Sequence, residues 1–155
     1  MRLSEQNKIV HALEPQDHQA GVDSDSVNTE NYGHVAFIIQ FGELTGNAVL
    51  KVYSGATDGT KTTAETFNYR ATSTDLKNTG GDTLGSETTS AALTLTASTY
   101  EDRMIVVEMD TAEFTDGQNF ITLEFSSDAS ELFVSSVAVL SDARYQQSTP
   151  PAAVA

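Results

Sequence analysis

The sequence predicts an all-β protein: an antiparallel, jelly-roll-like β-sandwich with about eight strands. Short apolar or alternating segments recur at intervals marked by turn residues, and no segment carries the periodicity of a long helix. Eight strands with long crossing loops favour a jelly roll over an immunoglobulin-like sandwich. The chain also contains no Cys and no Trp, the residues that mark an immunoglobulin domain.

The strongest strand prediction is His34–Phe41, a continuous apolar run between two glycines. Its length and its β-branched and aromatic content predict a central strand with both faces covered. Further strands are predicted at Ala48–Tyr53, Thr66–Ala71, Ala92–Ala97, Met104–Met109, Phe120–Phe125 and Phe133–Leu140. We expect one hairpin between His34–Phe41 and the strand that follows it, and another between Ala92–Ala97 and Arg103–Met109.

The connections are less regular. Residues 21–30 are predicted to form an edge strand or an ordered loop. Asp23 and Asp25 alternate in this segment like ligands of a hard cation, but the other oxygen ligands that a calcium site needs are missing from the pattern. Residues 72–90 form the longest stretch without an apolar pattern and predict a binding loop or a mobile surface loop, with a candidate short strand at Asp82–Ser86. Thr111–Phe114 predicts a one-turn helix.

The two ends are predicted to lie outside the sandwich domain, which spans residues 21–141. Residues 1–20 are expected to form an N-terminal arm, in which Ser4 is a candidate cap of a short helix that ends before Pro15. Such an arm either lies on its own domain or docks apolar residues on a neighbouring subunit. Residues 142–155 are expected to form a C-terminal tail, because they lose all periodicity and include Pro150 and Pro151.

Charge and composition exclude several classes of function. The 155 residues suit one domain that needs no disulfide or metal. The net charge of -14 repels nucleic acid and anionic membranes, and no apolar segment approaches the ~20 residues of a spanning helix. The absence of Cys fits assembly in a reducing cytoplasm, and the opening residues lack the apolar core of a secretory signal.

No set of residues predicts a reaction centre. Phosphate-binding loops, nucleophile elbows and H-E-x-x-H motifs are absent, and the three histidines do not form a triad pattern. Glu108 and Glu124 form a glycosidase-like pair only if their strands are adjacent. The prediction is therefore no enzyme, no cofactor and no metal, while the scattered tyrosines leave a carbohydrate-binding module open.

Three segments resemble a known family. LSEQNKIVHALEPQD (residues 3–17), NYGHV (residues 31–35) and VSSVAVLSDARYQQ (residues 134–147), the last followed by a Pro-rich end, are similar to small virion proteins of tailed bacteriophages. These are capsid decoration, or cement, proteins with jelly-roll domains. The resemblance covers both ends and the strand layout, whereas residues 55–100 match in character only.

The resemblance implies a non-enzymatic protein that binds the outer capsid surface and stabilises the head. It implies the major capsid protein as partner, a homotrimer, synthesis in the bacterial cytoplasm and a final location on the capsid exterior. The residues expected to contact the capsid or a neighbouring subunit are Leu3, Ile9, Val10, Leu13, Arg144 and Tyr145. The alternatives are a head-fibre, tail or receptor-contacting virion protein, or a sugar-binding module.

Overall fold

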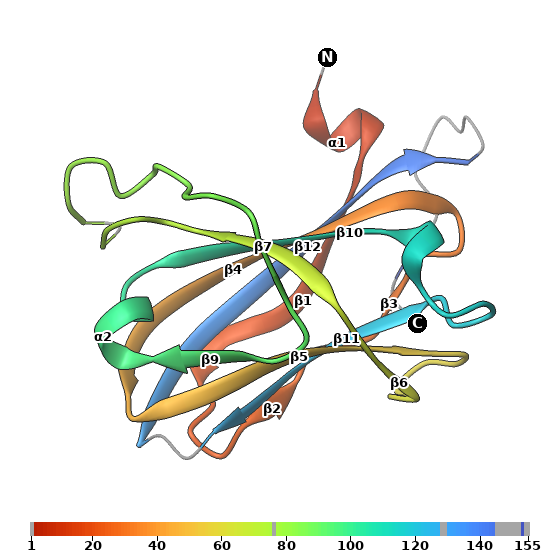
Figure 1. Cartoon of the computed structure of the whole chain (residues 1–155). Helices are drawn as coiled ribbons and strands as arrows, with labels where there is room; N and C mark the ends of the chain where they lie inside the picture. Colours follow the sequence, from red (N-terminus) through yellow and green to blue (C-terminus); the bar gives the residue numbers. More distant parts are fainter. Residues whose placement is uncertain (1, 76, 128–129, 145–152, 154–155) are drawn as a thin grey trace.

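Two antiparallel sheets face each other in this protein, whose computed structural model describes residues 2–75, 77–127, 130–144 and 153 (Figure 1). Sheet A has the order β1 (Lys8–Asp17), β12 (Glu131–Ala143), β4 (Tyr32–Thr45), β10 (Met104–Asp110), β7 (Phe67–Ala71), β8 (Thr88–Ser90). Sheet B has the order β2 (Val22–Asp23), β11 (Phe120–Ser127), β5 (Asn47–Gly55), β6 (Thr63–Glu65), with β3 (Val27–Asn28) also on β11 and β9 (Leu93–Thr96) also on β5. The predicted antiparallel β-sandwich is confirmed.

Every strand predicted from the apolar pattern is present, and the alternation of side chains places the core between the sheets. The inward row of β4 is Val35, Phe37, Ile39 and Phe41, all of which are buried. The rings of Phe41 and Phe125 meet edge to face across the two sheets, with centroids 6.3 Å apart. The core therefore follows the strand period of two that the sequence displays.

Helical structure in the described residues is limited to single turns: α1 (Leu3–Gln6), α2 (Ala97–Tyr100) and the 3-10 helix η1 (Thr111–Glu113). The one-turn helix predicted at Thr111–Phe114 is confirmed. The short strand predicted at Asp82–Ser86 is displaced, because β8 lies at Thr88–Ser90 and only an isolated bridge joins Leu84 to Thr72.

Both predicted hairpins are wrong. β4 belongs to sheet A and β5 to sheet B, and the chain turns between them at Gly46, whose φ of 85° suits glycine. β9 belongs to sheet B and β10 to sheet A, with α2 between them. Neighbouring strands of the sequence pack face to face here, whereas the expected short loops would have paired them side by side.

The predicted N-terminal arm is also wrong over most of its length. Residues 8–17 form β1, an edge strand of sheet A that pairs with β12 from Lys8↔Leu140 to Asp17↔Phe133. Pro15 lies in this strand because an edge strand tolerates a residue without an N–H, and the pairing is irregular on either side of Leu13. The sandwich therefore begins at Lys8, and the described residues that precede it, 2–7, include α1.

The C-terminal boundary is close to the predicted one, since β12 ends at Ala143. Residues 145–152 lie outside the described residues. Ala153 is buried in the core, and its carbonyl accepts a hydrogen bond of 2.8 Å from the Asn28 N–H. At least this residue of the predicted tail therefore packs on its own domain.

Basic side chains hold the long connection between β7 and β8. Arg70 donates to the Gly85 carbonyl at 3.1 Å, and Arg103 donates to the Thr72 and Ser73 carbonyls at 3.2 and 2.9 Å. Lys77 bridges to Asp102 at 2.6 Å. This loop extends beyond the sheets on the α2 side of the molecule (Figure 1).

Candidate contact surface on the outer face of sheet A

The outer face of sheet A carries an apolar stripe. We define the A-face stripe as Ile9, Ala36, Ile38, Met104, Val106, Phe133, Val137 and Val139, which point away from the core on β1, β4, β10 and β12. Ile9, Phe133 and Val137 are 44%, 41% and 37% exposed, and the others are half-buried. Outer faces of antiparallel sheets are usually polar, so this one is suited to contact with another surface.

Strand register joins the apolar side chains of the A-face stripe in two neighbouring rows, while Ser135 and Gln40 lie between these rows and Phe133. Ile38 lies between Val137 of β12 and Val106 of β10. In the next row, Val139 pairs with Ala36 on one side and with Ile9 of β1 on the other. Apolar side chains from four neighbouring strands are thus brought into one surface, although they come from distant parts of the sequence.

A shallow groove of about 190 Å³ continues the stripe at the Phe133 end, between Pro15 and Gly42. A Cβ at Gly42 would lie 3.1 Å from the Cβ of Phe133, so the glycine allows Phe133 to lie close across β4. Gln40 lines the same groove and supplies an amide beside the apolar walls. The groove could accept an apolar side chain from a partner.

The outer face of sheet B differs, because loops of the same chain cover part of it. The Ser26 and Thr122 hydroxyls are 2.7 Å apart and buried, and the Gly59 N–H donates to Ser26 at 2.9 Å. Lys61 bridges Asp23 and Glu124 at 2.8 and 2.6 Å.

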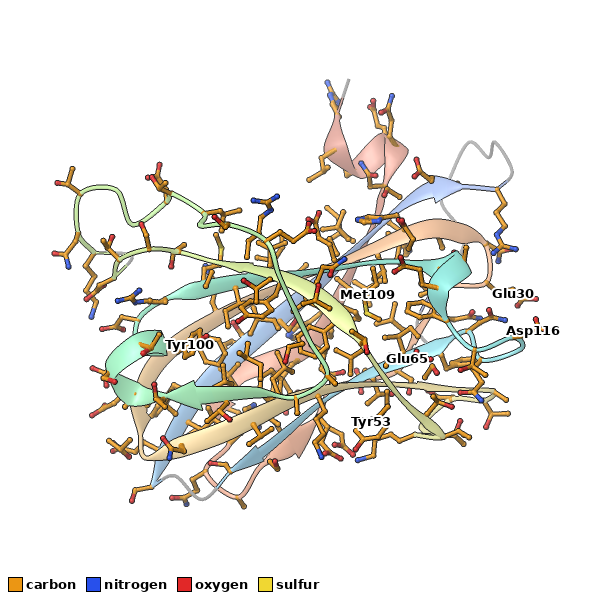
Figure 2. The ribbon with its side chains drawn as sticks, in the orientation of Figure 1. Glu30, Tyr53, Glu65, Tyr100, Met109 and Asp116 are labelled. Atoms are coloured by element: carbon orange, nitrogen blue, oxygen red, sulfur yellow. The ribbon has the colours of Figure 1, made fainter. Side chains whose placement is uncertain are left out.

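The hydrogen bonds from Lys61 to Asp23 and Glu124 raise the pKa of Lys61 above its ordinary value, and the bond to Asp23 contributes more. The Lys61 ammonium also lies 5.5 Å from the centre of the Tyr53 ring. Tyr53 lies on the side of sheet B that faces away from sheet A (Figure 2). This face is therefore polar and partly occupied by the chain itself.

Carboxylates lie at both ends of the A-face stripe. At one end His34 is 2.9 Å from Asp110 and 3.7 Å from Glu108, beside a pocket of about 150 Å³ that Glu87 and Glu113 also line. His34 is therefore paired with the acidic side chains of Asp110 and Glu108 on β10.

At the other end of the stripe, Glu43 repels Glu131 and raises the pKa of Glu131 above its ordinary value. Desolvation and the nearby Asp17 act in the same direction. The apolar middle of the face is therefore bounded by negative charge along the strand direction.

The predicted contact residues divide between the surface and the core. Val10 and Leu13 are only 4% and 5% exposed and pack inside their own sandwich, so they are unavailable to a partner. Ile9 lies in the A-face stripe. Leu3 is exposed on α1, which stands clear of the sheets, and Arg144 is exposed directly after β12 (Figure 1). Tyr145 lies outside the described residues.

The alternative sites predicted from sequence do not assemble. Glu108 projects from sheet A and Glu124 from sheet B, so they do not form the pair on adjacent strands that a glycosidase reading requires. Asp23 is bound to Lys61, and no cluster of three or more metal-binding side chains occurs among the described residues.

The tyrosines do not form a stacking platform in the described part of the chain. Tyr32 and Tyr100 are buried, Tyr69 packs against the core, and Tyr53 lies under the Lys61 ammonium. Nothing in their arrangement favours sugar binding.

Comparison with known proteins adds no relative: no protein-family model matches the chain, and neither a curated protein nor a solved structure does. None of the helices in the described residues is long and apolar enough to cross a membrane.

The apolar run that contributes most to the stripe is visible in the sequence, where it predicts a strand buried on both faces. The run His34–Phe41 predicted a strand covered on both faces, but sheet B covers only one face, and Ala36 and Ile38 on the other remain half-buried. Residues 104–107 and 137–140 are apolar on both faces in the same way. β4, β10 and β12 thus carry apolar side chains on both faces, and no described segment of the chain covers their outer face.

Proposed function

We propose that this protein is a non-enzymatic structural protein of a phage virion, which binds the outer capsid surface and stabilises the head as a decoration, or cement, protein. The observation that carries the binding role is the A-face stripe, an apolar surface on strands whose sequences suit cover on both sides. The virion setting rests on the resemblance of the two chain ends and of NYGHV to phage decoration proteins.

The charge of the chain supports an exterior location. A net charge of -14 opposes contact with packaged DNA, so a position outside the shell is favoured over one inside it.

The jelly-roll assignment is part of the same proposal. Its support is the strand order β1-β12-β4-β10 in one sheet and β2-β11-β5-β9 in the other. Taken in chain order, these strands cross between the sheets at every step except from β5 to β9, which pair within sheet B. In this interpretation β6, β7 and β8 form an insertion between β5 and β9.

The proposed mechanism is burial of apolar surface across a boundary between capsid subunits. Each buried square ångström contributes about 25 cal/mol, and the contribution is repeated at every copy on the shell. The major capsid protein is the proposed partner and a homotrimer the proposed assembly. Ile9 lies in the contact, while Leu3, Arg144 and Tyr145 remain proposed contacts at the chain ends.

Co-sedimentation with purified heads of the parent phage, stripped of this protein, tests the proposal. The added chain should pellet with the heads, saturate at a fixed copy number and raise the temperature at which the heads release DNA. Bovine serum albumin, another acidic protein, serves as the control and should stay in the supernatant.

Two other outcomes would replace this proposal. Binding to tails or to whole cells but not to heads would assign the chain to a fibre or receptor contact. Binding to a glycan array without binding to heads would assign it to sugar recognition.

A further inference from the structure

We propose that the A-face stripe is the docking surface, and that its occupant is a capsid-protein surface with an apolar middle and basic groups at both ends. This inference rests on the proposed function for the identity of the partner. Its chemistry follows from the face itself: apolar side chains from four strands in the middle, and carboxylates at each end.

Charge complementarity selects this occupant. The chain has 22 acidic and 8 basic residues, and Lys61, Arg70, Lys77 and Arg103 are engaged in internal contacts that hold loops. The ends of the stripe carry Glu108 and Asp110 on one side and Glu43 and Glu131 on the other, and a basic partner would neutralise these carboxylates. A second copy of this chain would instead bring another net charge of -14 against the same face.

Comparison of the two outer faces selects the surface. On the outer face of sheet B, Ser26 and Gly59 cover part of β11, and Lys61 neutralises the carboxylate of Glu124. On sheet A, Ile9, Phe133 and Val137 remain at least 37% exposed, and the groove beside Phe133 is open to a partner side chain. Burial in a complex would therefore remove far more apolar surface from water on sheet A.

A matched pair of substitutions tests the apolar part. Val137→Thr replaces a methyl with a hydroxyl in the middle of the stripe, and Val49→Thr makes the same change on the outer face of sheet B. Head binding should weaken about tenfold for Ile38→Thr combined with Val137→Thr, and measurably for Val137→Thr alone. Val49→Thr should bind as the unchanged chain does, and circular dichroism should show that every variant is folded.

A second pair tests the charged ends. Glu108→Gln with Glu131→Gln removes one carboxylate from each end of the stripe, while Asp58→Asn with Asp116→Asn removes two from exposed turns. Binding of the unchanged chain should weaken as NaCl is raised, and the first double variant should show a smaller salt dependence than the second.

The outcomes separate this inference from the proposed function. Heads that bind the stripe variants and the unchanged chain equally would overturn the docking surface and leave the decoration role intact. Stripe variants that turn an oligomer into monomers in analytical ultracentrifugation would make the occupant a second copy, and would also overturn it.

If the unchanged chain does not bind heads, the decoration role fails, and a second probe decides the surface. Beads that carry phenyl and quaternary ammonium groups present an apolar and cationic surface to the free protein. The stripe variants should elute from these beads before the unchanged chain and Val49→Thr. Equal elution would overturn the inference.

Discussion

Ser136 is a polar side chain in the apolar layer between the sheets. It points inward from β12, opposite Ile39, is 1% exposed, and its hydroxyl has no hydrogen-bond partner among the described residues. A buried hydroxyl without a partner costs free energy on folding, so Ser136→Ala should raise the free energy of unfolding by about 1 kcal/mol. Urea denaturation measures this, with Ser135→Ala on the outer side of β12 as the control. A less stable Ser136→Ala would show that the hydroxyl is satisfied.

Tyr100 couples stability to alkaline pH. Burial of the Tyr100 side chain at the end of α2, with a smaller effect of Tyr69, raises the pKa of Tyr100 to about 12. In the unfolded chain the phenol titrates near pH 10, so the unfolded state loses its proton first and stability should fall as the pH rises from about 10 to about 12. Tyr100→Phe removes this ionisation and should flatten that decline by about 2 kcal/mol, measured by urea denaturation across the pH series. Parallel declines in the two proteins would contradict this assignment.

At the scale of elements, the sequence predicts strands well and their partners poorly. Phe67, Leu93, Leu95 and Ile121 all face the core as alternation predicts, because that pattern is local. Strand pairing depends on where the chain crosses between the sheets. The turn residues around Gly46 suit a hairpin turn as well as a crossing between sheets, so the sequence does not distinguish the two. β1 was missed because Pro15 suggested the end of a helix.

The placement of β1 gives a direct test. Leu13 lies in the core, so Leu13→Ala should lower the free energy of unfolding of the isolated protein by about 2–5 kcal/mol. Ile9→Ala, on the exposed side of the same strand, should change it by less than about 1 kcal/mol. The measurement is urea denaturation of the free chain. A neutral Leu13→Ala would restore the interpretation of residues 1–20 as an arm.

α1 tests the remaining part of that arm. None of its residues is buried, so deletion of residues 1–6 should leave the thermal midpoint unchanged within about 2 °C. Differential scanning calorimetry measures this. The same truncated chain reports whether Leu3 contributes to head binding, because a loss of affinity without a loss of stability would place α1 in the contact.

At the scale of the whole molecule, the candidate surface was predictable only in part. The apolar run on β4 predicts a strand covered on both faces, but a sequence does not specify whether the second cover comes from the same chain. Ile9 was predicted as a contact and lies in the stripe, whereas Val10 beside it points into the core. The sign of the charge was evident from composition, but its concentration at the two ends of one face depends on the strand register.

The net charge of -14 should make stability depend on salt. Carboxylates repel one another across the surface, and raising NaCl from about 0.02 to about 0.5 M shortens the screening length from roughly 20 Å to roughly 4 Å. We expect the thermal midpoint to rise by a few degrees. Glu131→Lys changes the net charge from -14 to -12 and removes the repulsion from Glu43, so it should raise the midpoint at low salt and reduce the salt effect. A midpoint that falls with salt would show that ion pairs such as Lys61 with Glu124 outweigh the repulsion.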